Sequence, residues 1–511
     1  MRILTSENIK EVERLAHDSG SSYLQMMENA GSYCARIIRK TFENTNKRKV
    51  LIVCGKGKNG GDGFVIARKL REDGYNVVVM MAMGLPSDGE SSEMLSRIRA
   101  MGINIMYFDE NGSADKAFDS AQIIVDCVFG IGFKGEIDSR SAGLFQKINS
   151  SSATVISVDI PSGLYADCGV CNEAAVCADM TVAVMALKPV HVLKPSKEIC
   201  GKVVVAPIGI PESCFERVNS TLFTLSSNDI KSFFTRRSAD SHKGTYGTVL
   251  VIGGSYEMPN APYFAAQAAV NSGAGIVKIA FPDSAYNAIA PKTYEQILVP
   301  LKSNNNGRIS IDSAKRLEEE ISECSAVVIG CGMGVDEDTK AIVKFTLENS
   351  KVPVIIDADG INCVADRIDI IDSAQAPVIL TPHPGEMSRL CGKTVKEIQA
   401  DRVKALQDFT RRRKAVLALK GSSTLVGSNE YDDVYVNSTG NPGMATGGSG
   451  DVLAGIIASF AAQGIEPFKC AVAAVYIHGT AGDTVTEKYS MMGNTPSLIL
   501  KELPTVLKNC E

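Results

Sequence analysis

Uninterrupted apolar runs alternate with helical segments along most of the chain, and this alternation restricts the possible folds more than any other feature. Runs that stay apolar at successive positions suit strands of a parallel sheet that is buried on both faces. Helical periods such as Phe64–Asp73 and Glu93–Met101 lie between the runs, which predicts βαβ units. In the first part of the chain the runs are Val50–Cys54, Val77–Ala82, Ile103–Phe108, Ile123–Val128, Val155–Asp159, Thr181–Ala186 and Val203–Ala206.

The same alternation restarts after a polar, turn-rich stretch at residues 216–245. At 511 residues the chain also exceeds what one hydrophobic core normally supports. We therefore predict two α/β domains, residues 1–220 and 225–511, each a layered sheet with helices on both faces. The apolar runs of the second domain are Thr248–Ile252, Ile276–Phe281, Ala326–Ile329, Val354–Asp357, Val378–Thr381 and Ala415–Leu419.

Charge and hydropathy exclude several classes of protein. A net charge of −5 argues against a nucleic-acid binder, which needs a basic face. The chain has neither the apolar stretch of a signal peptide near its start nor a run of about 18 apolar residues, so no membrane span is expected and the protein is predicted to be cytoplasmic. The cluster Cys168, Cys171 and Cys177 lacks a nearby histidine as fourth ligand, which disfavours zinc.

A glycine-rich loop, Gly55-Lys-Gly-Lys-Asn-Gly-Gly-Asp-Gly63, follows the first long apolar run and opens a helix. Backbone N–H groups at such a position favour a phosphate. The loop fits the spacing of the dinucleotide fingerprint, but Val79–Ala82 lacks the acidic residue that a dehydrogenase places there for the ribose hydroxyls. An NAD-dependent dehydrogenase is therefore disfavoured. A merely tight strand-to-helix turn remains the alternative interpretation.

Polar residues also follow two later strands of the same domain. Asp126 precedes a glycine-rich turn, and Asp159 precedes Ile-Pro-Ser-Gly163. Open α/β sheets bind ligands at the carboxyl ends of their strands, where these residues are expected. Asn59, Asp126 and Ser162 offer amide, carboxylate and hydroxyl oxygens that suit a hard cation. Alternatively, Asp126 and Asp159 cap turns.

The second domain contains Thr446-Gly-Gly-Ser-Gly-Asp-Val-Leu-Ala-Gly455. Residues Gly447–Gly450 present successive N–H donors at a helix start, which can hold phosphoryl oxygens. Asp451 can accept the proton of a hydroxyl that attacks phosphorus. In the alternative interpretation the glycines only allow close helix packing, with Asp451 as a favourable charge at the helix start. The segment Lys420-Gly-Ser-Ser-Thr424 offers a cation and hydroxyls to a nucleotide phosphate.

The first domain resembles the NAD(P)H-hydrate epimerases in four motifs, Met27–Gly31, Gly55–Gly63, Val125–Gly132 and Val158–Gly163. The resemblance implies a Rossmann-like three-layer sandwich that interconverts the R and S forms of hydrated NADH and NADPH, called NADHX and NADPHX. It further implies that Asp159 contacts the substrate ring or acts as a base. The implied potassium ligands are Asn59, Asp126 and Ser162. The implied substrate-binding residues are Lys58, Asn59, Gly60, Gly61, Asp62, Gly130, Ile131, Gly132, Phe133, Lys134, Gly135, Glu136 and Asp159; at Lys58 the family usually has Asn.

The second domain, over roughly residues 225–505, is similar to the ADP- or ATP-dependent NAD(P)H-hydrate dehydratases of the ribokinase-like superfamily. This resemblance implies a ribokinase-like α/β fold, phosphoryl transfer to the ring hydroxyl after Asp451 removes its proton, and then loss of phosphate. Mg²⁺ would arrive with the nucleotide. The implied substrate-binding residues are Ala261, Gly332, His383 and Asp451. The implied residues for ADP or ATP are Lys420, Gly421, Ser422, Ser423, Thr424 and Gly450. Cys331 and Met333 replace the commoner Pro and Leu of the family.

We therefore predict a bifunctional enzyme that epimerises NADHX and NADPHX and then dehydrates the S form to NAD(P)H. A homo-oligomer is expected. One alternative is a small-molecule kinase, acting on a hydroxymethylpyrimidine or a sugar, with a nucleotide-sensing first domain. Another is a non-catalytic binding protein. The sequence does not distinguish ADP from ATP or NADHX from NADPHX, and it leaves open whether substrate passes directly between the two sites.

Overall fold

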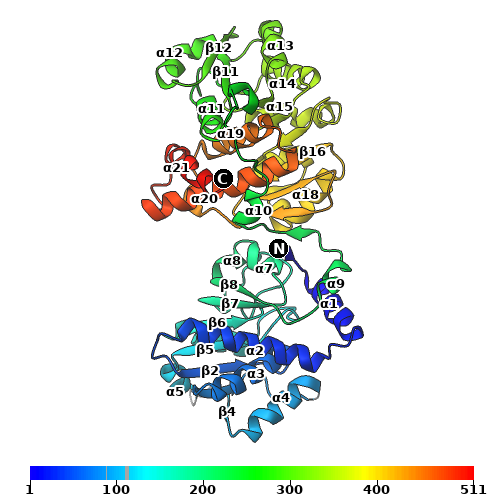
Figure 1. Ribbon diagram of the computed structural model, residues 1–511, viewed down its shortest axis with the longest axis vertical. Helices are drawn as coiled ribbons and strands as arrows, with labels where there is room; N and C mark the ends of the chain where they lie inside the picture. The colour runs from blue at the N-terminus through cyan, green and yellow to red at the C-terminus, as the bar shows by residue number, and fades with distance from the viewer. Residues whose placement is uncertain (88, 110–113, 511) are drawn as a thin grey trace. The chain divides into compact units, whose positions relative to one another are not determined.

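The computed structural model describes residues 1–87, 89–109 and 114–510. Residues 88 and 110–113 of the predicted first domain, and residue 511 at the end of the predicted second, lie outside the described residues. The chain divides into two compact units, Met1–Leu222 and Phe223–Glu511. Each unit has helices on both faces of a mainly parallel sheet, which confirms the predicted α/β fold class (Figure 1).

The sheet of the first unit is parallel throughout and runs in the order β4-β3-β2-β5-β6-β7-β8. Each of the predicted apolar runs overlaps one of its strands, with bounds that agree to within two residues. The strand order changes direction between β2 and β5, which is where open α/β sheets place ligands beyond the strand ends. The strands are β2 (Lys49–Cys54), β3 (Asn76–Met81), β4 (Asn104–Tyr107), β5 (Ile123–Cys127), β6 (Thr154–Val158), β7 (Met180–Val184) and β8 (Lys202–Ala206).

Helices cover both faces of this sheet because its strands are apolar on both sides. In β2, Ile52 packs into one core layer with helices α2 to α4, whereas Leu51 packs into the other with α5 and α6. The helices of the unit are α1 (Ser6–Asp18), α2 (Tyr23–Phe42), α3 (Lys58–Glu72), α4 (Gly89–Ala100), α5 (Asp115–Ser120), α6 (Ser139–Ser150), α7 (Pro189–Val192), α8 (Ser196–Ile199) and α9 (Glu212–Glu216). Two short strands, β1 (Arg2–Ile3) and β9 (Leu222–Phe223), lie near the ends of this unit's chain segment.

In the second unit the strand order is β18-β17-β16-β15-β14-β13-β10-β11-β12. All pairings are parallel except those that add β17 and β18. Here the order changes direction between β10 and β13. The strands are β10 (Thr248–Ile252), β11 (Ile276–Pro282), β12 (Ile297–Leu301), β13 (Ala326–Ile329), β14 (Val354–Ile356), β15 (Val378–Leu380), β16 (Ala415–Leu419), β17 (Leu425–Ser428) and β18 (Val434–Val436).

The α-helices of the second unit are α10 (Ser227–Lys231), α11 (Ala261–Asn271), α12 (Tyr286–Ile289), α13 (Ala314–Ser322), α14 (Glu337–Asn349), α15 (Asp359–Val364), α16 (Pro384–Cys391), α17 (Val395–Ala400), α18 (Arg402–Thr410), α19 (Ser449–Ala462), α20 (Pro467–Lys488) and α21 (Pro496–Lys508). Its 3₁₀ turns are η1 (Lys243–Tyr246), η2 (Asp283–Ala285), η3 (Ala290–Lys292), η4 (Ile311–Ser313), η5 (Ala365–Ile370) and η6 (Pro442–Met444).

Helix α19 is the most buried of the long helices in this core, and its position sets the second site. It packs beside α11 and α20, and almost all of its side chains are buried. At Gly455 a Cβ would lie 2.0 Å from the carbonyl oxygen of Ala265, so the absent side chain permits the close approach of α11. This glycine of the predicted motif therefore serves packing, as the alternative interpretation of the motif proposed.

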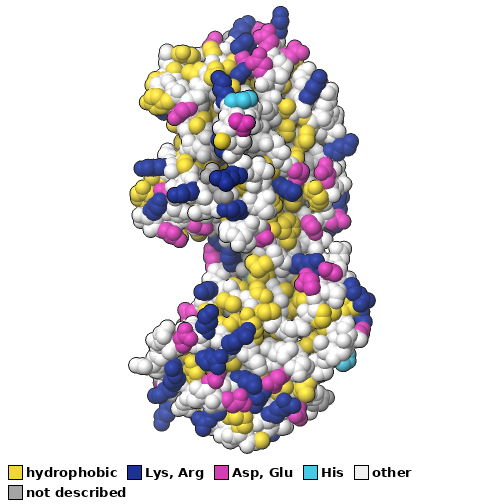
Figure 2. Space-filling view, viewed as in Figure 1, with side chains coloured by type: hydrophobic (Ala, Val, Ile, Leu, Met, Phe, Trp, Pro, Cys, Tyr) yellow, Lys and Arg dark blue, Asp and Glu magenta, His cyan; other side chains and the backbone are white. Residues whose placement is uncertain are grey.

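Charged side chains of both signs lie on the surface of the protein (Figure 2). On the face drawn in Figure 2, acidic and basic side chains are interspersed and form no continuous basic stripe. Among the described residues, no helix combines the length and the apolar character that a membrane span needs.

Candidate active sites

The first candidate site begins at the turn between β2 and α3. A Cβ on Gly55 would lie 2.1 Å from the carbonyl oxygen of Val128, and a Cβ on Gly60 would lie 1.9 Å from that of Gly55. These two glycines let the turn close against the end of β5. Gly57 has open space around it and caps α3 without a side-chain hydrogen bond. The N–H groups of the first turn of α3 therefore remain available to an anion.

The three predicted cation ligands of this unit lie together. Asp126 and Ser162 are fully buried; the Ser162 hydroxyl donates to Asp126 Oδ1 at 2.6 Å, and the Ser162 N–H donates to Oδ2 at 2.9 Å. Asn59 Nδ2 donates to the carbonyl of Phe129 at 3.0 Å, and the Ser162 hydroxyl lies 3.3 Å from the same oxygen. Burial raises the pKa of Asp126, although the two Ser162 groups and Ser157 donate to its carboxylate.

One oxygen of this cluster has no donor. Asn59 Oδ1 is buried, and no described residue donates a hydrogen bond to it. Buried acceptors without a partner are rare because their desolvation is uncompensated. A bound cation would compensate it, so the cluster fits the ion that the sequence resemblance implied.

Asp159 connects this cluster to the loop after β5. It follows β6 with a φ of 70°, and its Oδ2 accepts a hydrogen bond from Ile131 N at 3.1 Å. Within the same loop, the ring of Phe133 stacks between Phe129 and Tyr165, at centroid distances of 4.7 and 5.8 Å. The predicted substrate residues thus follow β2 (Lys58–Asp62), β5 (Gly130–Glu136) and β6 (Asp159), at one edge of the sheet.

The structure also shows the contacts of Lys58, the position at which the family usually has Asn. Lys58 Nζ lies 3.0 Å from Glu13 Oε2 and 4.8 Å from the ring centroid of Tyr23, and its side chain is mostly exposed. Glu13 and Tyr23 come from α1 and α2, so the first two helices line this side of the turn. Nearby, burial raises the pKa of Asp62 well above its usual range, and the charge of Asp159 adds to the effect.

Sequence reasoning missed two residues of this site. Lys188 and His191 follow β7, are buried, and contact Asp159 through its carboxylate and its carbonyl oxygen respectively. The available signal was Lys188-Pro-Val-His191 directly after a predicted strand, where a lysine and a histidine interrupt apolar residues. Fully buried lysines need a partner, so this pattern could have prompted a search for an acid.

The second candidate site lies at the start of α19. Gly448 caps this helix with a φ of 94° and no side-chain hydrogen bond, and Gly447 has open space around it. The N–H groups of the turn are therefore available, as the sequence predicted for an anion site. Asp451 lies in the first turn of α19, and burial, together with the charge of Asp357, raises its pKa to about 7.

A buried ion pair lies beneath this turn. Lys420 Nζ is 2.6 Å from Asp357 Oδ1, which also accepts a hydrogen bond from the Thr381 hydroxyl at 2.8 Å. A Cβ on Gly450 would lie 3.0 Å from Lys420 Nζ, so the ammonium sits directly against the anion turn. Burial raises the pKa of Glu386, which is 4.0 Å from the same ammonium, to about 7. Sequence reasoning assigned no role to Asp357 or Glu386.

The remaining predicted residues line the same edge of the sheet. His383 caps α16: its Nδ1 accepts from Gly385 N at 2.9 Å, and burial lowers its pKa. Gly332 lies against Ala261, since a Cβ there would be 2.6 Å from that of Ala261. The segment Lys420–Thr424 is the turn between β16 and β17, in which Gly421 and Ser422 are exposed and Ser423 is buried.

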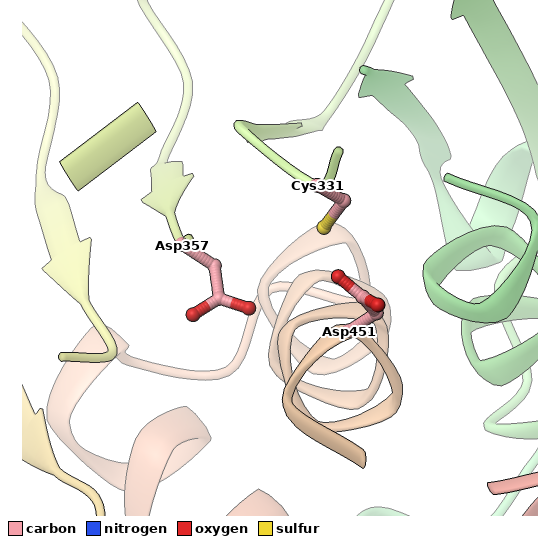
Figure 3. Close-up of side chains that lie close together, drawn as sticks. All are labelled: Cys331, Asp357 and Asp451. Carbon is pink, nitrogen blue, oxygen red and sulfur yellow. The ribbon is translucent and has the colours of Figure 1, made fainter. Parts of the chain in front are cut away.

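Figure 3 shows the side chains of Cys331, Asp357 and Asp451 pointing toward one another, with ligand atoms within 4.8 Å. In the described part of the chain, this is the one group of three or more such side chains close enough to share a metal ion. The ammonium of Lys420 already pairs with Asp357 there. Cys168, Cys171 and Cys177 are free cysteines and do not belong to this group.

The chain is similar to known proteins over its whole length. Residues 249–505 match the model of a family described as NAD(P)H-hydrate dehydratase, and residues 23–190 match the model described as YjeF-related protein N-terminus. A bifunctional NAD(P)H-hydrate repair enzyme Nnr of Moorella thermoacetica is 37% identical over 521 residues, covering 100% of this chain and 97% of the relative. The enzyme of the same name from Archaeoglobus fulgidus is 34% identical over 513 residues, covering all of both chains.

Among solved structures, an ADP/ATP-dependent NAD(P)H-hydrate dehydratase from Bacillus subtilis, co-crystallised with ATP/Mg2+, is 28% identical with a TM-score of 0.48. It covers 56% of this chain and 98% of its own.

Proposed function

Because the chain belongs to the family of bifunctional NAD(P)H-hydrate repair enzymes, we propose that each of its two sites performs one of the two repair reactions. The enzyme is an NAD(P)H-hydrate epimerase and dehydratase. The single observation that carries the assignment of sites is that each compact unit matches one of the two family models and gathers one group of motif residues at the carboxyl edge of its own sheet.

We assign epimerisation to the first unit. The first turn of α3 would bind a phosphate of NADHX or NADPHX through its free N–H groups. The loop Gly130–Glu136 would cover the nucleotide, and Asp159 would contact the hydrated ring as a base. The hydrogen bond from Ile131 N to Asp159 Oδ2 supports this placement, because it joins the loop to the carboxylate.

We propose that Asn59, Asp126 and Ser162 hold a potassium ion. The unpartnered Asn59 Oδ1 supports the proposal, as does the raised pKa of the buried Asp126, whose charge a cation would compensate. The ion would supply fixed positive charge that holds the three chain segments together. Replacing K⁺ by tetramethylammonium at constant ionic strength is expected to lower the epimerase rate and the melting temperature of wild type, by linkage. In Ser162→Ala both responses should shrink; an unchanged response in that variant would contradict the site.

We assign dehydration to the second unit. Asp451 would accept the proton of the ring hydroxyl while the hydroxyl oxygen attacks the terminal phosphorus of ADP or ATP. The N–H groups of Gly447–Gly450 would bind the transferred phosphoryl oxygens, and Lys420–Thr424 would hold the nucleotide with its Mg²⁺. Loss of phosphate from the ring carbon, with loss of a proton from the adjacent carbon, then gives NAD(P)H. The carboxylate and ammonium at this turn support the assignment. The substrate would contact Ala261, Gly332 and His383.

The test is absorbance recovery in the reduced-nicotinamide band, starting from a mixture of R- and S-NADHX with Mg²⁺ and either ADP or ATP. Wild type is expected to recover all of the absorbance. Asp159→Asn should stop at the S fraction, and Asp451→Asn should recover none. If wild type recovers nothing with either nucleotide and instead releases a stable phosphorylated product, the second unit is a small-molecule kinase. Parallel assays with NADPHX compare the two substrates. Size-exclusion chromatography tests the predicted homo-oligomer.

A further inference from the structure

Two buried basic side chains hold Asp159 from different sides. The exposed fractions are 0% for Lys188, 2% for His191 and 8% for Asp159. Both basic residues come from one short segment after β7, in which Lys188 precedes α7 and His191 lies within it. The assignment of the two sites uses neither of them. A lysine that is fully withdrawn from water needs a compensating partner, and its placement here therefore requires an explanation.

The ammonium of Lys188 fixes the carboxylate of Asp159. Lys188 Nζ is 2.6 Å from Asp159 Oδ1 and 2.6 Å from the carbonyl oxygen of Val184. The second contact ties the ammonium to the end of β7, so it cannot follow the carboxylate if the latter rotates. With Oδ1 held in this way, Oδ2 accepts from Ile131 N in the predicted substrate loop. The two contacts leave the carboxylate with one defined orientation.

The imidazole of His191 fixes the backbone of Asp159. His191 Nδ1 accepts from Lys188 N at 3.0 Å, so the neutral ring carries its proton on Nε2. That Nε2–H donates to the carbonyl oxygen of Asp159 at 2.8 Å. Burial, with the charge of Lys188, lowers the pKa of His191 to about 3, so the ring stays neutral at physiological pH. Asp159 has a φ of 70°, a conformation that a non-glycine residue keeps only where its surroundings impose it.

The other titratable groups around Asp159 leave Lys188 as its cation. Asp62 on α3 and the thiol of Cys34 on α2 both sense the charge of Asp159, and burial raises the pKa of each. Neither group carries a positive charge. Of the described groups that face Asp159 from α2, α3 and the segment after β7, the ammonium of Lys188 thus supplies the compensating charge.

We propose that Lys188 and His191 are positioning residues of the epimerase reaction: Lys188 keeps the carboxylate of Asp159 oriented, and His191 holds its backbone in the left-handed conformation. The proposal rests on the assignment of Asp159 as the base of that reaction. It explains why a lysine and a histidine interrupt an otherwise apolar segment at the sheet edge.

The first experiment measures kcat and KM of the epimerase reaction for Lys188→Met. Without the ammonium, Asp159 Oδ1 loses its 2.6 Å partner, so the carboxylate is expected to leave the orientation in which it acts as a base. We expect kcat to fall by about 100-fold, with KM nearly unchanged, because general-base catalysis is weakened without loss of binding. A purely structural role would lower the melting temperature and leave the kcat of the folded enzyme unchanged.

The second experiment separates the two hydrogen bonds of His191. Gln can reproduce the Nε2 donor to the Asp159 carbonyl, whereas Asn can reproduce only the Nδ1 acceptor for Lys188 N. His191→Gln is therefore expected to keep most of the epimerase kcat, and His191→Asn to lose about tenfold, the equivalent of one hydrogen bond. Even if Lys188→Met fails to fold, this matched pair of variants shows whether His191 positions Asp159 through its carbonyl oxygen. Dehydration of pure S-NADHX by the second unit serves as the internal standard for each variant.

Three outcomes are distinguishable. If Asp159→Asn epimerises at the wild-type rate, the proposed role of Asp159 fails, and the positioning proposal fails with it. If Asp159→Asn loses its activity but Lys188→Met keeps its kcat, or the two His191 variants behave alike, the positioning proposal alone is overturned. If Lys188→Met lowers kcat, and adds no further loss to the residual rate of Asp159→Asn, Lys188 acts through Asp159.

Discussion

Asp451 has to be both buried and ionised, and the conflict between these two conditions should be visible in the pH dependence of dehydration. Burial is the main cause that raises its pKa to about 7. A base must be deprotonated to accept the hydroxyl proton. We therefore expect kcat/KM for dehydration of S-NADHX to fall as the pH decreases through about 7 and to level off above it. Asp451→Asn should abolish the activity at every pH while leaving epimerisation intact.

The contrast between two glycines of one turn tests the anion site. A Cβ on Gly450 would lie 3.0 Å from Lys420 Nζ, and the Asp357 ion pair limits how far this ammonium can retreat. A Cβ on Gly447 meets no atom within 4 Å. We expect Gly450→Ala to lower kcat/KM for the nucleotide by about tenfold, the equivalent of about 1.4 kcal/mol. Gly447→Ala is the matched control and should remain close to wild type; equal losses in both variants would contradict the role of Lys420.

Motif residues could be read from the sequence because each follows a strand and carries a chemically distinctive group. The glycine turns and Asp126 belong to this class. Lys188 and Asp357 also follow strands, but their roles could not be predicted because each acts through a partner that is distant in sequence. Lys188 lies 29 positions from Asp159, and Lys420 lies 63 positions from Asp357. Pairs of this kind are brought together by strand order, which no local spacing encodes.

At the scale of elements, the apolar runs predicted the buried parallel strands and missed those that differ from them. β12 is an edge strand, and its residues alternate between buried and exposed positions. β17 and β18 are short and pair antiparallel after the turn at Lys420–Thr424. Runs of continuous apolar residues identify strands covered on both faces. The open side of β12, and the Gly427-Ser428 end of β17, therefore give a weaker signal.

The turn between β2 and α3 offers an element-scale prediction for stability. A Cβ on Gly60 would lie 1.9 Å from a backbone oxygen, which cannot move aside as a side chain can. Gly60→Ala is therefore expected to destabilise the first unit by about 1–3 kcal/mol, as overpacking does. Gly57→Ala, in open space at the helix cap, should cost less than about 1 kcal/mol. Calorimetry of both full-length variants measures this; equal shifts would mean that the turn is not closed at Gly60.

At the scale of the whole molecule, the two proposed reactions are linked by the S form, which epimerisation makes and dehydration consumes. Every contact used to describe either site lies within one compact unit. We therefore expect each reaction to proceed without a residue of the other unit. The S form made by epimerisation is the same substrate for dehydration whether or not it leaves the chain.

Mixing two single-site variants tests this independence. Asp159→Asn alone should stop at the S fraction of an R and S mixture, and Asp451→Asn alone should epimerise without forming NADH. Together they are expected to recover all of the absorbance, because S-NADHX made by one chain can diffuse to the dehydratase site of another. The Asp159→Asn variant assayed alone over the same period measures spontaneous epimerisation. This background rate must be slow if the recovery is to be assigned to the mixture. A mixture that still stops at the S fraction, while wild type does not, would mean that substrate is transferred only within one chain or one assembly, and that the two units work as a coupled pair.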